Sequence, residues 1–263
     1  MKKNIITVRG GGDKLHQSGY PVLVTEIANP SAIRRQVAFS EAVYEKSYTV
    51  EGVTCYFAEN LTQAYDLMEH GKIALMIDPV GAVIREVKPA AVVDGILAKK
   101  NLGTARDMAP LTIALGPGFI AGQDVDAVVE TKRGHRLGRI IWEGSAIANT
   151  GIPGIIGGYG KERVIHAAAA GVFEDVRRIG DIVAEGETIA QIRTADGTIT
   201  PVTTQITGIL RGLLRSGYPV TPGFKVADVD PRREELSNCF LISDKSRCIA
   251  GSVLELVCAQ VWQ

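Results

Sequence analysis

An internal repeat lies in the last third of this chain. Segments 180–192 and 217–229 both read G-x-x-V-x-x-G-x-x-[IV]-A-x-[IV], at an offset of 37 residues. Matched glycines require matched turns, and matched β-branched positions require matched buried strand faces. We therefore predict that Gly180–Ile192 and Gly217–Val229 occupy pseudo-symmetric positions in one β-rich module, with Asp196-Gly197 as a hairpin turn between them.

This repeat is similar to the two halves of a biotinyl/lipoyl-type barrel-sandwich, in which each half turns on glycine and feeds a core strand. A carrier domain of that kind places its modified lysine on such a hairpin. The corresponding segment, Arg193–Pro201, reads RTADGTITP and contains no lysine. The pattern therefore favours the fold of a carrier domain and disfavours the carrier function.

A glycine turn follows the first apolar run of the chain. Asn4–Arg9 leads into Gly10, Gly11, Gly12 and Asp13, and a second apolar run ends at Glu26. This is the outline of a Rossmann-type unit, in which glycines approach a phosphate and the acidic residue binds a ribose. The third glycine of the fingerprint is absent, so an ordinary glycine turn remains the alternative.

The connection after this turn is short for a parallel crossover. Only Lys14–Ser18 separates Asp13 from Gly19, whereas a crossover between parallel strands needs about ten or more residues. Either the first unit is not a βαβ unit, or residues are missing. We predict that the native chain carries several more residues between Asp13 and Lys14.

Alternating strands and helices continue through the first half. Gly52–Ala58 is typical of a strand, and Asn60 is a candidate cap for a helix over Leu61–His70. Two further apolar runs end at Asp78 and Asp94. Acidic residues in this position line the ligand site of open α/β sheets, although both also suit a turn or a helix cap.

A group of basic residues follows a predicted strand in the second half of the chain. Arg133, His135 and Arg139 lie close together beside a glycine and form a possible anion site. The alternative is a solvated hairpin tip. Beyond it, a short alanine-rich helix is expected near Arg163–Ala170, and Ser243-Asp244 can cap an amphipathic C-terminal helix.

The overall composition excludes some functions. The chain has 29 Lys and Arg against 29 Asp and Glu, so no long-range field attracts nucleic acid or an anionic membrane. Its longest uncharged stretches are broken by Gly and Pro, which argues against a membrane span. The four cysteines show no metal-binding spacing and are expected to be free thiols in the cytoplasm; no metal site is predicted.

Several longer motifs, in order along the chain, resemble one known family. It is the family of YqeB-type accessory proteins of selenium-dependent molybdenum hydroxylases. The motifs are VRGGGD (Val8–Asp13), SAIRRQVAFSEAVY (Ser31–Tyr44), TVEGV (Thr49–Val53), KKNLGTARDMAP (Lys99–Pro110), ALGPGFIAGQDVDAVVET (Ala114–Thr131), RGHRLGR (Arg133–Arg139), NTGIPG (Asn149–Gly154) and GFKVADVDPR (Gly223–Arg232).

The resemblance implies a maturation factor that acts with a molybdenum hydroxylase or its maturation proteins. The family pattern continues after GGGD into a small-residue helix start that is absent here, in agreement with missing residues after Asp13. The ligand would be a nucleotide or molybdopterin cytosine dinucleotide. The alternative is an NAD(P)-dependent oxidoreductase or a selenium- or sulfur-transferring enzyme; no catalytic residue is assigned. The candidate ligand-binding residues are Gly10, Gly11, Gly12, Asp13, Glu26, Arg34, Arg35, Asp78, Lys99 and Lys100.

The predicted fold class is α/β, with a Rossmann-like N-terminal domain and a β-rich region that contains a biotinyl/lipoyl-like barrel-sandwich module. We place the Rossmann-like domain at 1–108 and a β-rich connecting region at 109–172. The barrel-sandwich module follows at 173–232, and a C-terminal strand and helix at 233–263 pack on the core.

Overall fold

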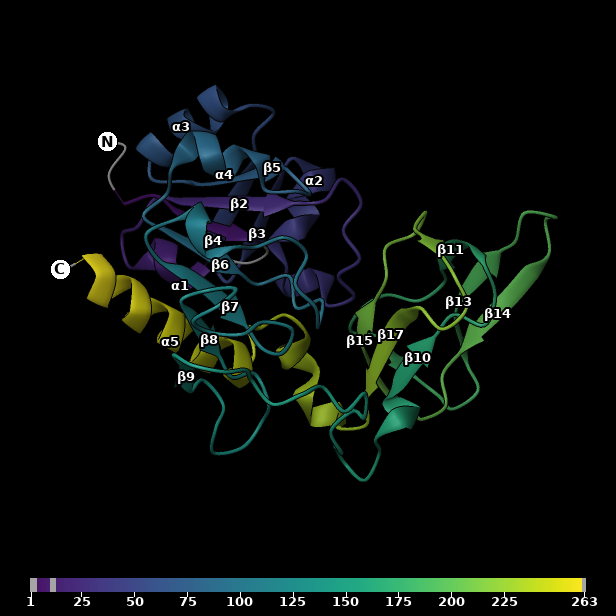
Figure 1. Ribbon diagram of the computed structural model, residues 1–263. Coiled ribbons are helices and arrows are strands. Elements are labelled where there is room, and N and C mark those ends of the chain that lie inside the picture. Colours follow the sequence, from purple (N-terminus) through teal and green to yellow (C-terminus); the bar gives the residue numbers. More distant parts are fainter. Residues whose placement is uncertain (1–3, 10–12, 262–263) are drawn as a thin grey trace. The chain divides into compact units, whose positions relative to one another are not determined.

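The computed structural model describes residues 4–9 and 13–261 of the chain, which divides into two compact units (Figure 1). The first unit comprises residues 1–30, 39–150 and 242–263, and the second comprises 31–38 and 151–241. The chain therefore enters the second unit twice and returns each time. These limits differ from the predicted boundaries, because the region 109–172 is shared between the units and segment 31–38 leaves the N-terminal domain.

A nine-stranded mixed sheet forms the centre of the first unit. Its strand order is β3-β4-β5-β2-β1-β6-β7-β8-β9. The strands from β4 to β8 in this order are parallel, and the outermost pairs, β3·β4 and β8·β9, are antiparallel. The strands are β1 Ile6–Arg9, β2 Val22–Glu26, β3 Ser47–Val50, β4 Val53–Phe57, β5 Ile73–Ile77, β6 Ala91–Asp94, β7 Thr112–Leu115, β8 Ala127–Val129 and β9 Ile140–Ile141.

The central strands are buried on both faces. Every residue of β1 and β6 is buried, and so are the first four of β2 and of β5. Such strands appear in the sequence as continuous apolar runs because neither face meets water. Two charged residues break this pattern in β1 and β6: Arg9 and Asp94, each at the last position of its strand.

The α-helices of the first unit are mostly short. They are α1 Asp13–Gln17, α2 Ala42–Glu45, α3 Leu61–Glu69, α4 Ala82–Val87 and α5 Asp244–Val261. The predicted cap of α3 is confirmed, since the Asn60 side chain accepts a hydrogen bond from the backbone N–H of Gln63 at 3.0 Å. Ser243 likewise accepts from the backbone N–H of Ser246 before α5, which confirms the predicted C-terminal helix.

The connection between β1 and β2 corrects one prediction. Helix α1 runs from Asp13 to Gln17 without interruption, and β1 and β2 pair in parallel. The few residues present are therefore enough to join two parallel strands, which corrects the expectation of a longer crossover, and further residues between Asp13 and Lys14 stay a prediction. The chain returns quickly because Gly19, at a φ of 88°, reverses it directly after one helical turn. Gly10, Gly11 and Gly12 lie outside the described residues.

The second unit consists of two four-stranded antiparallel sheets, β10-β17-β15-β12 and β14-β13-β11-β16. Residues 163–170, expected to form a helix, instead contain β10. The strands are β10 Val164–His166, β11 Gly171–Asp175, β12 Ile182–Val183, β13 Thr188–Arg193, β14 Ile199–Thr203, β15 Gly208–Leu213, β16 Pro219–Val220 and β17 Lys225–Asp230.

The predicted equivalence of the two repeats is confirmed by the strand pairing. β12 and β13 have the same lengths as β16 and β17 and lie 37 residues earlier in the chain. Each strand from β10 to β13 corresponds to one strand from β14 to β17, taken in order. When these labels are exchanged, the strand order of one sheet becomes that of the other. The hairpin at Asp196-Gly197 also forms, between the antiparallel strands β13 and β14.

The predicted fold class is nevertheless wrong. A Rossmann-like domain has helices over both faces of a parallel sheet, but here the sheet is mixed and residues 116–126 join β7 to β8 without a helix. The second unit consists of two antiparallel sheets, which replaces the prediction of a biotinyl/lipoyl-like barrel-sandwich. The repeat predicts which strands are equivalent, whereas the closure of the sheets depends on contacts distant in sequence. Residues 233–241, expected to contain a strand, form a 3₁₀ helix over Arg233–Cys239.

Two glycines hold equivalent close contacts in the two sheets. A Cβ added to Gly171 would lie 2.3 Å from the carbonyl oxygen of Arg193, and one added to Gly208 would lie 2.3 Å from that of Asp230. All four residues are related by the same 37-residue offset. The repeat therefore extends to the strand contacts at which only glycine fits.

We expect Gly171→Ala and Gly208→Ala to destabilise the second unit by similar amounts. Overpacking of this kind costs about 1–3 kcal/mol, and urea unfolding of each variant measures it. Gly154→Ala is the matched control, because a Cβ there meets no atom within 4 Å. Equal stability of Gly208→Ala and the unmodified protein would contradict the equivalence of the two contacts.

Candidate functional site

A buried arginine lies at the carboxyl end of the central strand β1. Arg9 is 2% exposed and donates from Nη1 to the Thr104 hydroxyl at 2.6 Å and from Nη2 to the carbonyl oxygen of Pro79 at 3.1 Å. The Thr104 hydroxyl donates in turn to Asp94 at 2.6 Å, and Arg9 lies 3.7 Å from the same carboxylate. A buried guanidinium requires such partners, because leaving it unpaired costs several kcal/mol.

This network joins the end of β1 to the end of β6 and to the loops that follow β5 and β6. Pro79 follows β5, Asp94 ends β6, and Thr104 belongs to the long loop after β6. Asn101 stiffens that loop, since its side chain accepts from the backbone N–H groups of Gly103 and Thr104. These hydrogen bonds hold the loops at the carboxyl edge of the sheet in place. Open α/β sheets bind ligands at this edge.

The two predicted acidic residues at this edge have structural partners. Asp78 accepts from the backbone N–H groups of Ala82 and Val83 at the start of α4, at 2.9 and 3.0 Å. It therefore acts as a helix cap, the alternative left open by the sequence. Asp94 belongs to the Arg9 network. Neither carboxylate is displayed to a ligand.

Glu26 remains at the end of β2, as predicted. Its side chain accepts a hydrogen bond from the backbone N–H of Ile27 at 2.7 Å. Burial raises the pKa of Glu26, while the Ile27 hydrogen bond lowers it in part. A carboxylate in this position is an acceptor for a ligand hydroxyl. Asp13 opens α1, and its neighbours Gly10–Gly12 are outside the described residues.

Two lysines approach each other at this edge from distant parts of the chain. Burial lowers the pKa of Lys99, even though much of its side chain is exposed. Burial also lowers the pKa of Lys245 in α5; the charges of Lys99 and Arg133 lower it further, and Glu130 opposes them. Positive charges therefore accumulate here from the loop after β6, the loop after β8 and the first turn of α5.

Gly118 allows the loop with Lys99 and Lys100 to pack closely. A Cβ at Gly118 would lie 2.6 Å from the backbone nitrogen of Lys100 and 2.7 Å from the carbonyl carbon of Lys99. The backbone of Gly118 has a φ of 113°, which disfavours other residues as well. The glycine of the GPG sequence after β7 thus sets the position of both predicted lysines.

The predicted anion site at Arg133, His135 and Arg139 is only partly assembled. All three side chains are exposed, and Arg133 forms a two-bonded pair with Asp244, at 2.7 and 3.0 Å. Gly138, in the same turn, packs against α5, where a Cβ would lie 2.8 Å from Cys248 Sγ. The turn is therefore attached to α5, and Arg133 adds its charge to the lysine pair.

Arg34 and Arg35 do not belong to this edge of the sheet. Both lie in segment 31–38 of the second unit. Arg34 donates to the carbonyl oxygen of Asn238 at 3.1 Å, and Arg35 donates to that of Leu213 at 2.9 Å. The sequence separated them from Glu26 by only a few residues, but the chain passes between units at this point.

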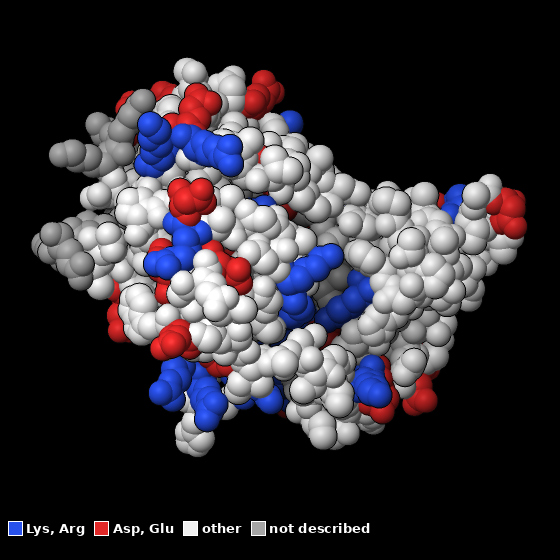
Figure 2. All heavy atoms as spheres, in the orientation of Figure 1, with Lys and Arg blue, Asp and Glu red and all other residues white. Residues whose placement is uncertain are grey.

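Three residues of this edge were not predicted from the sequence: Arg9, Thr104 and Lys245. A charged residue at the end of an apolar strand was the available signal for Arg9. Thr104 and Lys245 are 95 and more than 200 residues from Arg9 in the chain, so no local pattern reveals them. Figure 2 shows acidic and basic side chains interspersed on the visible face of the first unit.

Cys55 does not offer a reactive thiolate. Cys55 is buried within β4, and burial raises its pKa to about 12. Among the described residues, no group of three or more His, Cys, Asp or Glu side chains is placed to hold a metal ion. No described helix is both long and apolar enough to cross a membrane.

The chain is similar to "Uncharacterized protein YqeB" of Escherichia coli (strain K12), with 46% identity over 258 residues. The match covers 95% of this chain and 47% of that protein, so the chain spans about half the length of this curated relative. The similarity supports a relationship with YqeB, in agreement with the motifs of the sequence. No protein-family model matches the chain.

Solved structures match at low scores. The product-bound ectoine utilization protein EutE (DoeB) from Ruegeria pomeroyi has a TM-score of 0.27 and 12% identity, with 79% of this chain and 57% of that chain covered. An aspartoacylase family protein from Mesorhizobium loti has a TM-score of 0.30 and 9% identity, with 88% and 86% covered. Scores this low transfer neither a fold nor an activity.

We expect Thr104→Val to lower the free energy of unfolding, because it disrupts the network at the carboxyl edge of the sheet. The substitution removes the hydroxyl between Arg9 and Asp94, and losing hydrogen bonds to charged groups costs about 1.5–3 kcal/mol. Urea unfolding followed by circular dichroism measures the loss. Thr49→Val is the control, because its exposed hydroxyl bonds only to Thr54. An unchanged stability of Thr104→Val would show that the network does not organise this edge.

Proposed function

We propose that this chain is an accessory factor in the maturation of selenium-dependent molybdenum hydroxylases and that its first unit binds a phosphate-bearing ligand. The ligand class is a nucleotide or a molybdopterin dinucleotide, and the binding surface is the carboxyl edge of the nine-stranded sheet. The observation that carries the ligand proposal is the pair Lys99 and Lys245. Neither ammonium forms an ion pair with a carboxylate among the described residues.

The charge at this edge favours an anion. Lys99 and Arg133 are close enough to Lys245 to disfavour its charged form, and Glu130 is occupied by backbone N–H groups of Thr131, Lys132 and Ile147. A bound phosphate relieves the repulsion between like charges.

Apolar side chains at the same edge suit a heterocyclic ring. Ile27 and Ile77 follow or end β2 and β5, and they are 42% and 40% exposed. Ile96 and Leu97 follow β6 and are 38% and 45% exposed. Ligand sites combine an apolar lining with a few polar groups. A base or a pterin packed on these side chains would place its phosphate toward the lysines.

The maturation role rests on the family resemblance of the sequence motifs. Several of these motifs supply the carboxyl edge itself: VRGGGD contributes Arg9, and KKNLGTARDMAP contributes Lys99, Asn101 and Thr104. A partner hydroxylase or maturation protein follows from the same resemblance. The proposed setting is the cytoplasm.

An enzyme that transfers selenium or sulfur through Cys55 is disfavoured, because its thiol stays protonated below a pKa of about 12. An NAD(P)-dependent oxidoreductase would use the same carboxyl edge. The two ligand classes are separated by titrating the protein with CTP and with NADPH in parallel.

We expect Lys245→Met to weaken the binding of CTP about fivefold to tenfold, since it removes one charge-assisted contact. Isothermal titration calorimetry measures the affinity. Lys72→Met is the matched control, because Lys72 is exposed at the opposite end of β5. CTP binding that Lys245→Met and Lys99→Met leave intact would disprove the proposed site, and tight binding of NADPH alone would favour the oxidoreductase.

The lysine pair also gives a pH-dependent signature. The folded-state pKa of Lys245 lies below 10.5, so the unfolded chain binds more protons and stability rises with pH between the folded pKa and 10.5. We expect a bound phosphate to raise the pKa of Lys245. NMR titration of a side-chain-labelled protein with and without CTP measures the change; a pKa unaffected by bound CTP contradicts contact with the phosphate.

For the maturation role, co-expression with a selenium-dependent molybdenum hydroxylase is the direct test. We expect the specific activity of the hydroxylase to fall when the chain is omitted, with unchanged amounts of hydroxylase protein. An equal specific activity in the absence of this chain would refute the maturation role and leave the ligand proposal to the calorimetric test.

A further inference from the structure

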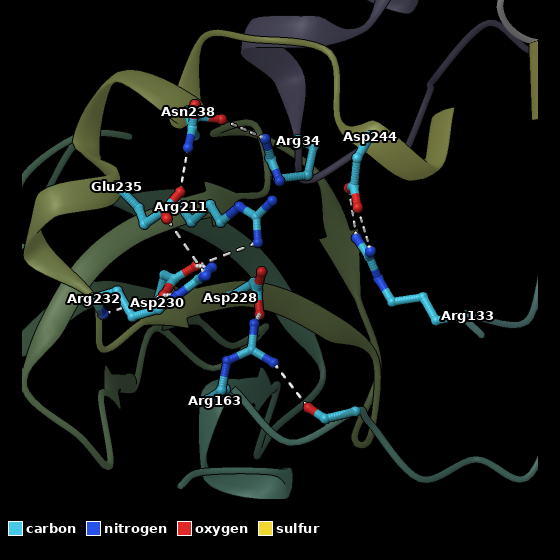
Figure 3. Close-up of polar contacts among 11 residues, drawn as sticks. Arg34, Arg133, Arg163, Arg211, Asp228, Asp230, Arg232, Glu235, Asn238 and Asp244 are labelled. Carbon is cyan, nitrogen blue, oxygen red and sulfur yellow. Dashed lines mark hydrogen bonds and ion pairs between the residues drawn. The ribbon is translucent and has the colours of Figure 1, made fainter. Parts of the chain in front are cut away.

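A second group of charged side chains lies wholly within the second unit (Figure 3). It brings together segment 31–38, the start of β10, the strands β15 and β17, and the 3₁₀ helix that follows. The side chains are Arg34, Arg163, Arg211, Asp228, Asp230, Arg232, Glu235 and Asn238. The proposed function of the first unit uses none of them.

Each carboxylate of this group already has an arginine. Asp228 lies 3.3 Å from Nη2 of Arg163. Asp230 accepts from Nε and Nη2 of Arg232 at 3.0 and 2.8 Å, a two-bonded contact that occupies both of its oxygens. Glu235 lies 3.5 Å from Arg232 and also accepts from the side chain of Asn238. Asp228 is therefore paired with Arg163, and Asp230 and Glu235 are paired mainly with Arg232.

Arg34 and Arg211 are left with weak partners. Arg211 reaches Asp230 only at 3.4 Å, on an oxygen that Arg232 already occupies. Arg34 donates to the neutral carbonyl oxygen of Asn238 and forms no ion pair among the described residues. The Nε atoms of both side chains are buried without a hydrogen-bond partner. Buried donors in this condition are rare in folded proteins.

These two guanidinium groups also repel each other. They end side by side in Figure 3. Burial lowers the pKa of Arg34, and the positive charge of Arg211 lowers it further, against the opposing charges of Asp228 and Asp230. Both side chains still reach solvent, since Arg34 is half-buried and the Arg211 side chain is 17% exposed. Two like charges held together at a partly buried surface favour an anion between them.

We propose that Arg34 and Arg211 together bind an oxyanion of the phosphate class at the second unit. Guanidinium groups match phosphate oxygens with paired N–H donors, and the carboxylates nearby are already paired and do not compete. Inorganic phosphate and the phosphate group of an ester share this chemistry. This site is independent of the ligand site proposed for the first unit, because all of its residues belong to the second unit.

The test is a calorimetric titration of the full chain with inorganic phosphate and, in parallel, with phenyl phosphate. We expect Arg34→Gln to weaken phosphate binding about tenfold or more, because a charged hydrogen-bond donor is lost. Arg193→Gln is the matched control, since Arg193 is an exposed arginine of the same unit that pairs with Glu174.

A second measurement uses the native protein and needs no variant. Phenylglyoxal modifies accessible arginines, and mass spectrometry locates the modified residues. We expect phosphate to protect Arg34 and Arg211 and to leave Arg193 unprotected. Tighter binding of phenyl phosphate than of inorganic phosphate identifies an ester as the ligand class, and the reverse identifies free phosphate. Equal affinity in Arg34→Gln and the unmodified protein, or an absence of protection, overturns the proposal.

Discussion

The first unit depends on how a single buried charge is accommodated. Arg9 ends the central strand β1, where water is excluded, and the desolvation of its guanidinium must be offset by close partners. Asp94, Thr104 and the carbonyl oxygen of Pro79 supply them. Because these partners belong to different loops, satisfying one charge fixes the carboxyl edge of the sheet. The same requirement explains why Asp94 is unavailable to a ligand.

The two charged regions of the chain differ in how they are balanced. Around Arg9, each described side-chain contact matches a donor with an acceptor. Around Arg34 and Arg211, the aspartates are already paired with other arginines. A balanced network stabilises loops, whereas surplus donors are suited to a ligand. This contrast, more than the number of charges, separates the structural site from the candidate anion site.

The residues of the candidate site were predictable to different degrees. Lys99 and Lys100 were recognised as a basic pair, and the edge of the sheet was recognised from the positions at which apolar runs end. Asp78 was equally compatible with the role of a helix cap and with that of a ligand-binding residue. Its two hydrogen bonds from backbone N–H groups of α4 show that it is a helix cap. Lys245 was not predicted, because its approach to Lys99 depends on the packing of α5 against the first unit.

The sequence by itself determined the equivalence of the two repeats, since matched glycines specify turns and matched β-branched residues specify strands through local geometry. It likewise determined α3 and its Asn60 cap, whose hydrogen bond spans three residues. The tertiary structure decided that segment 31–38 joins the second unit and that Arg34 lies beside Arg211. It also decided the mixed order of the large sheet. These features depend on contacts between residues far apart in the chain, for which no local spacing carries a signal.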